Sequence, residues 1–269
     1  AANQEGQAGY EGHLRKDVVT IAELLQDVGY HTYMTGKWHL GTGENNPAER
    51  GFEKSFALLN GAASHWADQG AIIPGSTTRY ISDGKIVERL PDDFYSSTWY
   101  TDQLISYISS NLDDDVPFFA FLSFTAPHNP LHVPKEYIDK YRGRFDKGWD
   151  ELAVKRLARL RKLGLVSESQ MPHPRPEWVM AWSELSPDQQ ATRARDMEVY
   201  AGMIDYVDES IGRVLEHLRK AGEYDNTLIA FMSDNGPSKT SITDYIALGG
   251  ESGEFFNQFD NSLGNRGLP

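Results

Sequence analysis

The order of segments along the chain is the feature that most constrains its fold. Three times, a segment with helical spacing is followed by a turn, an apolar strand and a polar cluster. That order is typical of a doubly wound α/β sheet. Helices are expected across 20–28, 97–112 and 186–221, and strands across YHTYMT (30–35), PFFAFLSF (117–124) and TLIAFM (227–232). We therefore expect an α/β fold with a mostly parallel central sheet flanked by helices.

Local signals mark the helix ends and the less regular regions. Thr20 to Glu23 matches a capping box, and Gly29 ends the helix that follows. Residues 41–91 are rich in glycine, proline and polar residues, which predicts an irregular insertion with one hairpin at Asp83-Gly84. Residues 135–185 are charged and interrupted by prolines, so we expect short helices on the outside of the fold.

Composition excludes several classes of function. The formal net charge of −13 argues against a nucleic-acid-binding protein, which usually carries a visible basic patch. No run approaches the roughly 18 apolar residues that span a bilayer, so the chain is expected to be soluble. The chain contains 0 cysteines, which removes disulfides, thiolate zinc sites and a cysteine nucleophile. Neither end resembles a domain terminus, and the chain is expected to be an internal piece of a longer protein.

Five polar residues follow the ends of the three predicted strands. Lys37 and His39 follow the first strand, His128 the second, and Asp234 with Asn235 the third. Ligands of open α/β sheets bind outside the carboxyl ends of the strands. Parallel pairing would therefore gather cations and a carboxylate at one edge of the sheet.

Taken alone, each of these groups has an ordinary structural interpretation. Lys37 is typical of a surface lysine, and His39 of a hydrogen-bonded structural histidine. A phosphate-binding Walker loop is excluded because the glycine spacing is wrong and Trp38 stands where serine or threonine should bind magnesium.

His128 and His132 have the HxxxH spacing that ligates zinc on a helix. Prolines at 127, 130 and 134 argue against a helix there, which favours a single functional histidine, His128, able to protonate a leaving group. The remaining histidines are interpreted as exposed or structural: His13, His31, His65, His173 and His217.

Asp234-Asn235-Gly236 is a common turn sequence, but its oxygen atoms also suit calcium or magnesium. Two residues cannot complete a shell of six or more oxygen atoms. Further ligands would have to come from elsewhere in the chain or from a missing segment.

TGKWHLG, FTAPHNPLHVP and SDNG, in this order, resemble the sulfatases of the alkaline phosphatase superfamily, most closely the bacterial arylsulfatases. RGFEKSFALLNGAA, FYSSTWYTDQL and MEVYAGMIDYVDESIGRVLEHLR extend the resemblance over nearly the whole chain. It implies an alkaline-phosphatase-like sulfatase fold, a sulfate monoester as small-molecule substrate, a calcium ion, and a formylglycine nucleophile made from cysteine or serine.

The resemblance also implies a role for each of the five residues. Lys37 would bind a sulfate oxygen, and His39 would contact the formylglycine hydroxyl. His128 would bind sulfate and protonate the departing alcohol or phenol. Asp234 and Asn235 would ligate calcium, with Asp234 also placed to help activate the nucleophile.

The family's C/S-x-P-x-R motif does not occur in this sequence. The adjacent aspartates that the family carries near its N-terminal strand, where they supply further calcium ligands, are also absent. The second sulfate-binding lysine, expected well downstream of SDNG, is missing too, since Lys239 is too close. Residues 1–269 are therefore expected to be part of a single sulfatase catalytic domain, lacking the nucleophile segment and a C-terminal portion, and inactive alone. The alternatives are a phosphomonoester or phosphonate monoester hydrolase of the same superfamily, or a non-catalytic remnant that binds anions.

Overall fold

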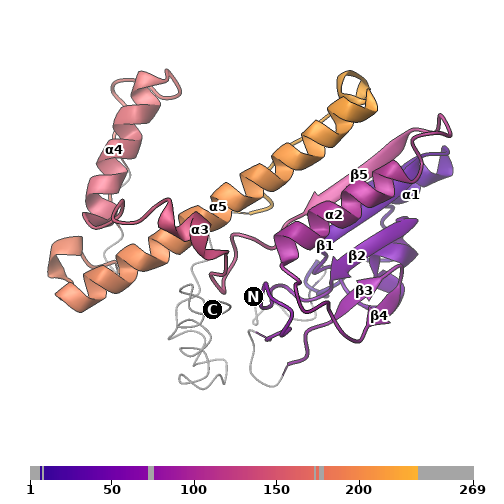
Figure 1. Ribbon diagram of the computed structural model, residues 1–269, viewed down its shortest axis with the longest axis horizontal. Helices are drawn as coiled ribbons and strands as arrows, with labels where there is room; N and C mark the ends of the chain where they lie inside the picture. The colour runs from indigo at the N-terminus through magenta and orange to yellow at the C-terminus, as the bar shows by residue number, and fades with distance from the viewer. Residues whose placement is uncertain (1–6, 8, 72–75, 173, 176–178, 236–269) are drawn as a thin grey trace.

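The computed structural model describes residues 7, 9–71, 76–172, 174–175 and 179–235. Within them the strands form one five-stranded sheet in the order β4-β3-β2-β1-β5, which Figure 1 shows with its helices. The strands are β1 His31–Lys37, β2 Lys54–Leu58, β3 Tyr80–Ser82, β4 Lys85–Val87 and β5 Phe118–Ser123. The helices are α1 Ile21–Asp27, α2 Ser96–Ser109, α3 Lys135–Asp139, α4 Gly148–Lys162 and α5 Pro187–Ala221, with short 3-10 turns η2 Gly43–Asn45, η3 Pro47–Arg50, η4 Trp182–Glu184 and η5 Tyr224–Asn226.

The centre of the sheet is parallel. β1 pairs in parallel with β2 on one side and with β5 on the other, and Gly36 lies opposite both Ala57 and Ser123. β3 and β4 form an antiparallel hairpin beside β2. The expected α/β sheet flanked by helices and the hairpin at Asp83-Gly84 are confirmed, and the sheet is mixed, with a parallel centre and antiparallel pairing at β3 and β4.

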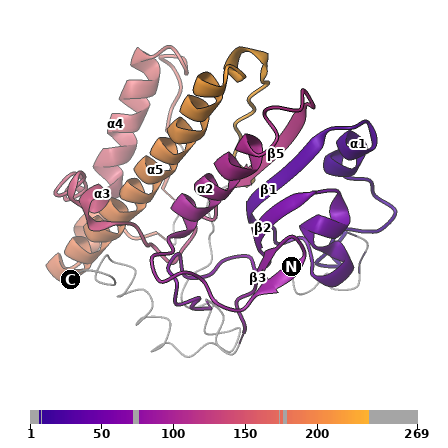
Figure 2. The ribbon, with the colours of Figure 1, turned by 45° about the vertical axis from the view of Figure 1, so that its right-hand side comes forward.

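Helices cover both faces of the sheet. Successive residues of β1 point to opposite faces, and each face packs against helices. Buried Tyr33 packs with Leu104 and Ile108 of α2 and with Leu218 of α5. Its neighbour Met34 packs on the other face, with Ala22 of α1. Figure 2 shows α2 along the sheet, α5 beside α2 and α4 beyond α5. Among the described residues, none of these helices is long and apolar enough to cross a membrane.

The predicted helix caps are present. The Thr20 hydroxyl accepts from the Glu23 amide at 3.1 Å, and the Glu23 carboxylate accepts from the Thr20 amide at 2.6 Å. Ser186 and Gln189 form a second capping box, and Gly222 ends α5 in the left-handed conformation. Local hydrogen bonds therefore place both ends of α5 where the sequence indicates.

The prediction of an irregular insertion across 41–91 is wrong for β2. Lys54–Leu58 lies between β1 and β3, and four of its five residues are buried. The run KSFAL is short and lacks alternation, so its strand character comes from pairing on both sides. β2 is therefore a central parallel strand that the sequence does not predict.

Two further strand predictions need correction. TLIAFM (227–232) forms no strand, and Leu228, Phe231 and Met232 are 96, 83 and 76% exposed. An apolar run becomes a strand only when a sheet edge pairs with it, and 227–232 pairs with no edge in the described chain. PFFAFLSF does form β5, but β5 occupies the edge of the described sheet, so it is only partly buried and Phe121 is 42% exposed.

Candidate functional site

The carboxyl ends of β1, β2 and β5 lie side by side and carry the candidate site. β1 ends at Lys37, and β5 ends at Ser123, five residues before His128. The close approach of the two strands depends on Gly36, whose φ is +118° and whose Cβ, if present, would stand 1.8 Å from the Ser123 carbonyl oxygen. Parallel pairing thus brings Lys37, His39 and His128 to one edge.

Trp38 fixes the chain between Lys37 and His39. Its side chain is buried, its Nε1 donates to the Asn45 carbonyl at 2.6 Å, and its ring meets Phe52 edge-on at 6.1 Å. Lys37 is half-buried, and no described ion pair includes it, so its ammonium is available to an anion. His39 lies at the surface with its ring partly covered, and its φ of +53° is a left-handed conformation that is uncommon for residues other than glycine.

Lys37 and His128 both influence the ionisation of His39. The pKa of His39 is lowered, first by the partial burial of its ring and then by the positive charges of Lys37 and His128. A Cβ on Gly61 would stand 2.8 Å from His39 Nε2, so the imidazole lies against the bare backbone after β2. Neutral His39 can accept a hydrogen bond, and an incoming anion would favour its protonated form.

The His128 ring has a defined tautomer. Its Nδ1 lies 2.7 Å from the Asn129 carbonyl oxygen, which can only accept, so Nδ1 carries the proton of the neutral ring. Nε2 is therefore the nitrogen that gains and loses a proton. This leaves Nε2 as the atom able to bind an anion or to protonate a leaving group.

Two buried histidines lie behind His128. Burial lowers the pKa of His65 to about 4 and that of His132 to about 3, so both rings are neutral near pH 7. The His65 amide donates to His132 Nδ1 at 3.3 Å. Because that nitrogen is already an acceptor and residues 124–134 contain no helix, the HxxxH zinc pair gains no support.

The histidine at 65 is structural, as the sequence suggests, but its partners could not be foreseen. It lies in the loop after β2. The signal that could have drawn attention to it is the apolar run FALL (56–59) followed by a polar loop, the same order that marks the other site strands.

Asp234 and Asn235 do not form a metal site by themselves. Both are exposed and follow a segment without strand structure. Among the described residues, no group of three or more His, Cys, Asp or Glu side chains could hold a metal ion. Two oxygen-bearing side chains fall short of the six to eight oxygen ligands that calcium takes.

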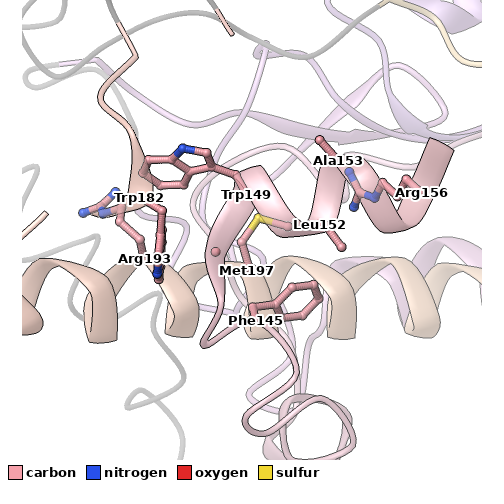
Figure 3. A pocket seen from close by; sticks show the side chains of 9 residues that line it. Phe145, Trp149, Leu152, Ala153, Arg156, Trp182, Arg193 and Met197 are labelled. Carbon is pink, nitrogen blue, oxygen red and sulfur yellow. The ribbon is translucent and has the colours of Figure 1, made fainter. Parts of the chain in front are cut away.

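A separate hollow of about 290 Å³ lies between α4, α5 and the η4 turn (Figure 3). Trp149 and Trp182 meet edge-on at 4.9 Å on its wall, beside Met197 and between Arg156 and Arg193. None of the five predicted site residues lines it. The strand ends therefore remain the candidate active site.

Comparison with known families and proteins gives a consistent result. A family model described as Sulfatase matches residues 2–258. An arylsulfatase of Klebsiella aerogenes is 42% identical over 267 residues, which cover 97% of this chain and 56% of the relative. An uncharacterized sulfatase of Schizosaccharomyces pombe is 41% identical over 270 residues, covering 97% and 48%. The chain spans about half the length of these curated relatives.

Solved structures share the fold at lower identity. The crystal structure of Ps i-CgsB in complex with k-i-k-neocarrahexaose has a TM-score of 0.54 and 22% identity, covering 80% of this chain and 39% of that one. BT4656 in complex with D-glucosamine-2-N,6-O-disulfate has a TM-score of 0.50 and 20% identity, covering 80% and 49%. At these identities the likeness shows a common fold.

Proposed function

This chain belongs to the sulfatase family, and from that premise we propose that the full-length protein is a sulfuric ester hydrolase of the arylsulfatase type. It cleaves a sulfate monoester into an alcohol or phenol and sulfate. The observation that carries the proposal is the meeting of Lys37, His39 and His128 at the ends of β1 and β5. Basic groups gathered at one edge of the sheet match an anionic ester.

Lys37 and His128 bind the sulfuryl oxygen atoms. The Lys37 ammonium offers a point charge, and Nε2 of protonated His128 offers a directed N–H donor. Negative charge grows on the ester oxygen as the S–O bond breaks, and the His128 proton neutralises it on the departing alcohol or phenol. His39 lies beside Lys37 and takes part as an acceptor for the hydroxyl that attacks sulfur.

The attacking hydroxyl lies outside this sequence. Sulfatases generally use a formylglycine hydroxyl that takes the sulfuryl group, and this sequence contains neither cysteine nor a C/S-x-P-x-R segment. We assign Lys37, His39 and His128 to one wall of the active site. The domain expected over residues 1–269 would then receive its nucleophile from another segment of the full-length protein.

Sulfatases generally also use calcium, for which Asp234 and Asn235 are the proposed ligands here. They would supply two oxygen donors, and no group of three or more His, Cys, Asp or Glu side chains among the described residues adds to them. No step above depends on the ion.

The proposal is tested by assaying the full-length gene product on an aryl sulfate and on the matching aryl phosphate. We expect preference for the sulfate, and loss of that activity on changing His128→Asn or Lys37→Met. A preference for the phosphate or a phosphonate monoester would overturn the sulfatase assignment. Anion binding without hydrolysis of either ester would point to the non-catalytic alternative.

A further inference from the structure

A buried imidazole, His65, joins three segments that meet behind the candidate site. Its side chain is 1% exposed, and it lies in the loop after β2. Nδ1 lies 2.7 Å from the hydroxyl of Ser96, the first residue of α2. Nε2 lies 3.2 Å from the backbone carbonyl oxygen of His128, in the loop after β5.

The partners determine where the His65 proton resides. A carbonyl oxygen can only accept, so Nε2 must carry the hydrogen and donate it to His128. Nδ1 is then a lone pair that accepts from the Ser96 hydroxyl. A backbone hydrogen bond also joins His65 and Ser96, since the Ser96 amide donates to the His65 carbonyl at 2.9 Å.

The same contacts fix the loop that carries His128. The His65 amide donates to His132 Nδ1 at 3.3 Å, and the Tyr95 hydroxyl donates to the His132 carbonyl at 3.0 Å. The loop between β5 and α3 is thus held at His128 and again four residues later. These contacts set the position of the His128 ring and of its Nε2.

We propose that His65 is a positioning residue: its Nε2–H bond to the His128 carbonyl, with the imidazole oriented by the Ser96 hydroxyl at Nδ1, holds the His128 ring where it protonates the leaving group. The inference rests on the function proposed above for His128. Displacing a catalytic group by about 1 Å can cost about 100-fold in rate. His65 therefore influences the proton transfer without touching the substrate.

Two substitutions of His65 separate this role from simple core filling. The amide nitrogen of His65→Gln reaches close to the position of Nε2 and can still donate to His128. The shorter His65→Asn reaches Ser96 but not the His128 carbonyl. Both place a neutral amide in the same buried space, so they form a matched pair, and Ser96→Ala tests whether the hydrogen bond at Nδ1 is needed to orient the ring.

The experiment uses the full-length gene product and aryl sulfates whose phenols differ in acidity. Poor leaving groups need the proton most, so His128→Asn should reduce kcat most for the least acidic phenols. We expect His65→Asn to reproduce that steeper dependence, losing about 10- to 100-fold in kcat on the poorest leaving group with little change in KM. His65→Gln should stay within about threefold of the wild type, because it keeps the donor.

Equal loss across all phenols in His65→Asn, or failure of His65→Gln to restore the dependence, would overturn the inference. If His65→Asn does not fold, Ser96→Ala is compared with the wild type instead. We expect kcat of Ser96→Ala to depend more steeply on the acidity of the phenol, and an unchanged dependence would overturn the inference. A wild type that hydrolyses no aryl sulfate refutes the proposed function. In that case the ¹⁵N spectrum of selectively labelled histidine tests the positioning contact alone, which requires protonated Nε2 and bare Nδ1 at His65.

Discussion

Gly61 lies directly against the imidazole of His39: a Cβ on Gly61 would stand 2.6 Å from ring Cε1. The three nearest atoms all belong to that ring, so Gly61→Ala should act first on His39. We expect kcat of the full-length protein on an aryl sulfate to fall by about tenfold or more, with stability nearly unchanged. Steady-state kinetics measure the change in kcat, and thermal unfolding measures the change in stability.

Gly70→Ala is the matched control for that substitution. Gly70 lies in the same loop region, and its nearest neighbour, the Ser64 Cβ, would be 3.5 Å away, an ordinary contact. Activity close to wild type is expected. Equal losses in both variants would mean that the loop, and not the His39 ring, accounts for the effect.

The pKa of His39 should depend on the charge of Lys37. Burial, the charge of Lys37 and the charge of His128 all disfavour its protonated form. Lys37→Met removes one of these causes, so the pKa of His39 should rise while remaining below that of a free histidine, because burial is the largest cause. A histidine titration followed by NMR measures it, with Lys54→Met, at the start of β2, as the control.

Sulfate should act on His39 in the same direction as Lys37→Met. A bound anion favours the protonated ring, so it raises the pKa of His39, and by linkage sulfate binds more tightly as pH falls through that pKa. An unchanged His39 titration in saturating sulfate would remove His39 from the anion site.

The buried pair His65 and His132 predicts a loss of stability in acid. Unfolded histidine binds a proton below about pH 6.5, whereas the folded rings stay neutral down to a pKa of about 4 for His65 and about 3 for His132. The unfolded state therefore holds more protons between these limits, and the free energy of unfolding falls as pH drops from 6.5 toward 4. Each pKa unit corresponds to about 1.4 kcal/mol.

Urea unfolding at pH 7 and pH 4.5 measures this loss. His132→Asn keeps an acceptor for the His65 amide but cannot titrate, so it should show a smaller drop between the two pH values than wild type. His13→Asn changes an exposed ring and should show the wild-type drop. A drop in His132→Asn as large as in wild type would contradict the assignment.

How far the sequence predicts the fold depends on the range of the interactions involved. The caps at Thr20 and Ser186 join residues three apart, so the sequence alone places both helix starts. Strands β1 and β5 are recognisable because their apolar and β-favouring residues are continuous. Which segments pair with one another cannot be predicted in this way. TLIAFM has the composition of a strand but pairs with no sheet edge in the described chain, whereas KSFAL forms a strand because it pairs on both sides.

The same difference between local and long-range interactions applies to the candidate site. The position of Lys37, His39 and His128 near the ends of β1 and β5 could be predicted because both strands are recognisable in the sequence. The support given by His65 could not, since its ring joins residues 31 and 63 positions away. Gly61 likewise carries no local signal, because only the folded chain brings it against His39.

Calcium binding provides the last test, because the described oxygen donors are too few. Asp234 and Asn235 give two ligating side chains where calcium requires six to eight oxygen atoms. Calorimetric titration of residues 1–269 should therefore show weak calcium binding or none, whereas the full-length protein should bind calcium and lose affinity on Asp234→Ala. Asp225→Ala, which changes another aspartate of the same region, should leave that affinity unchanged. Tight binding by residues 1–269, abolished by Asp234→Ala, would show that the remaining ligands lie within this chain.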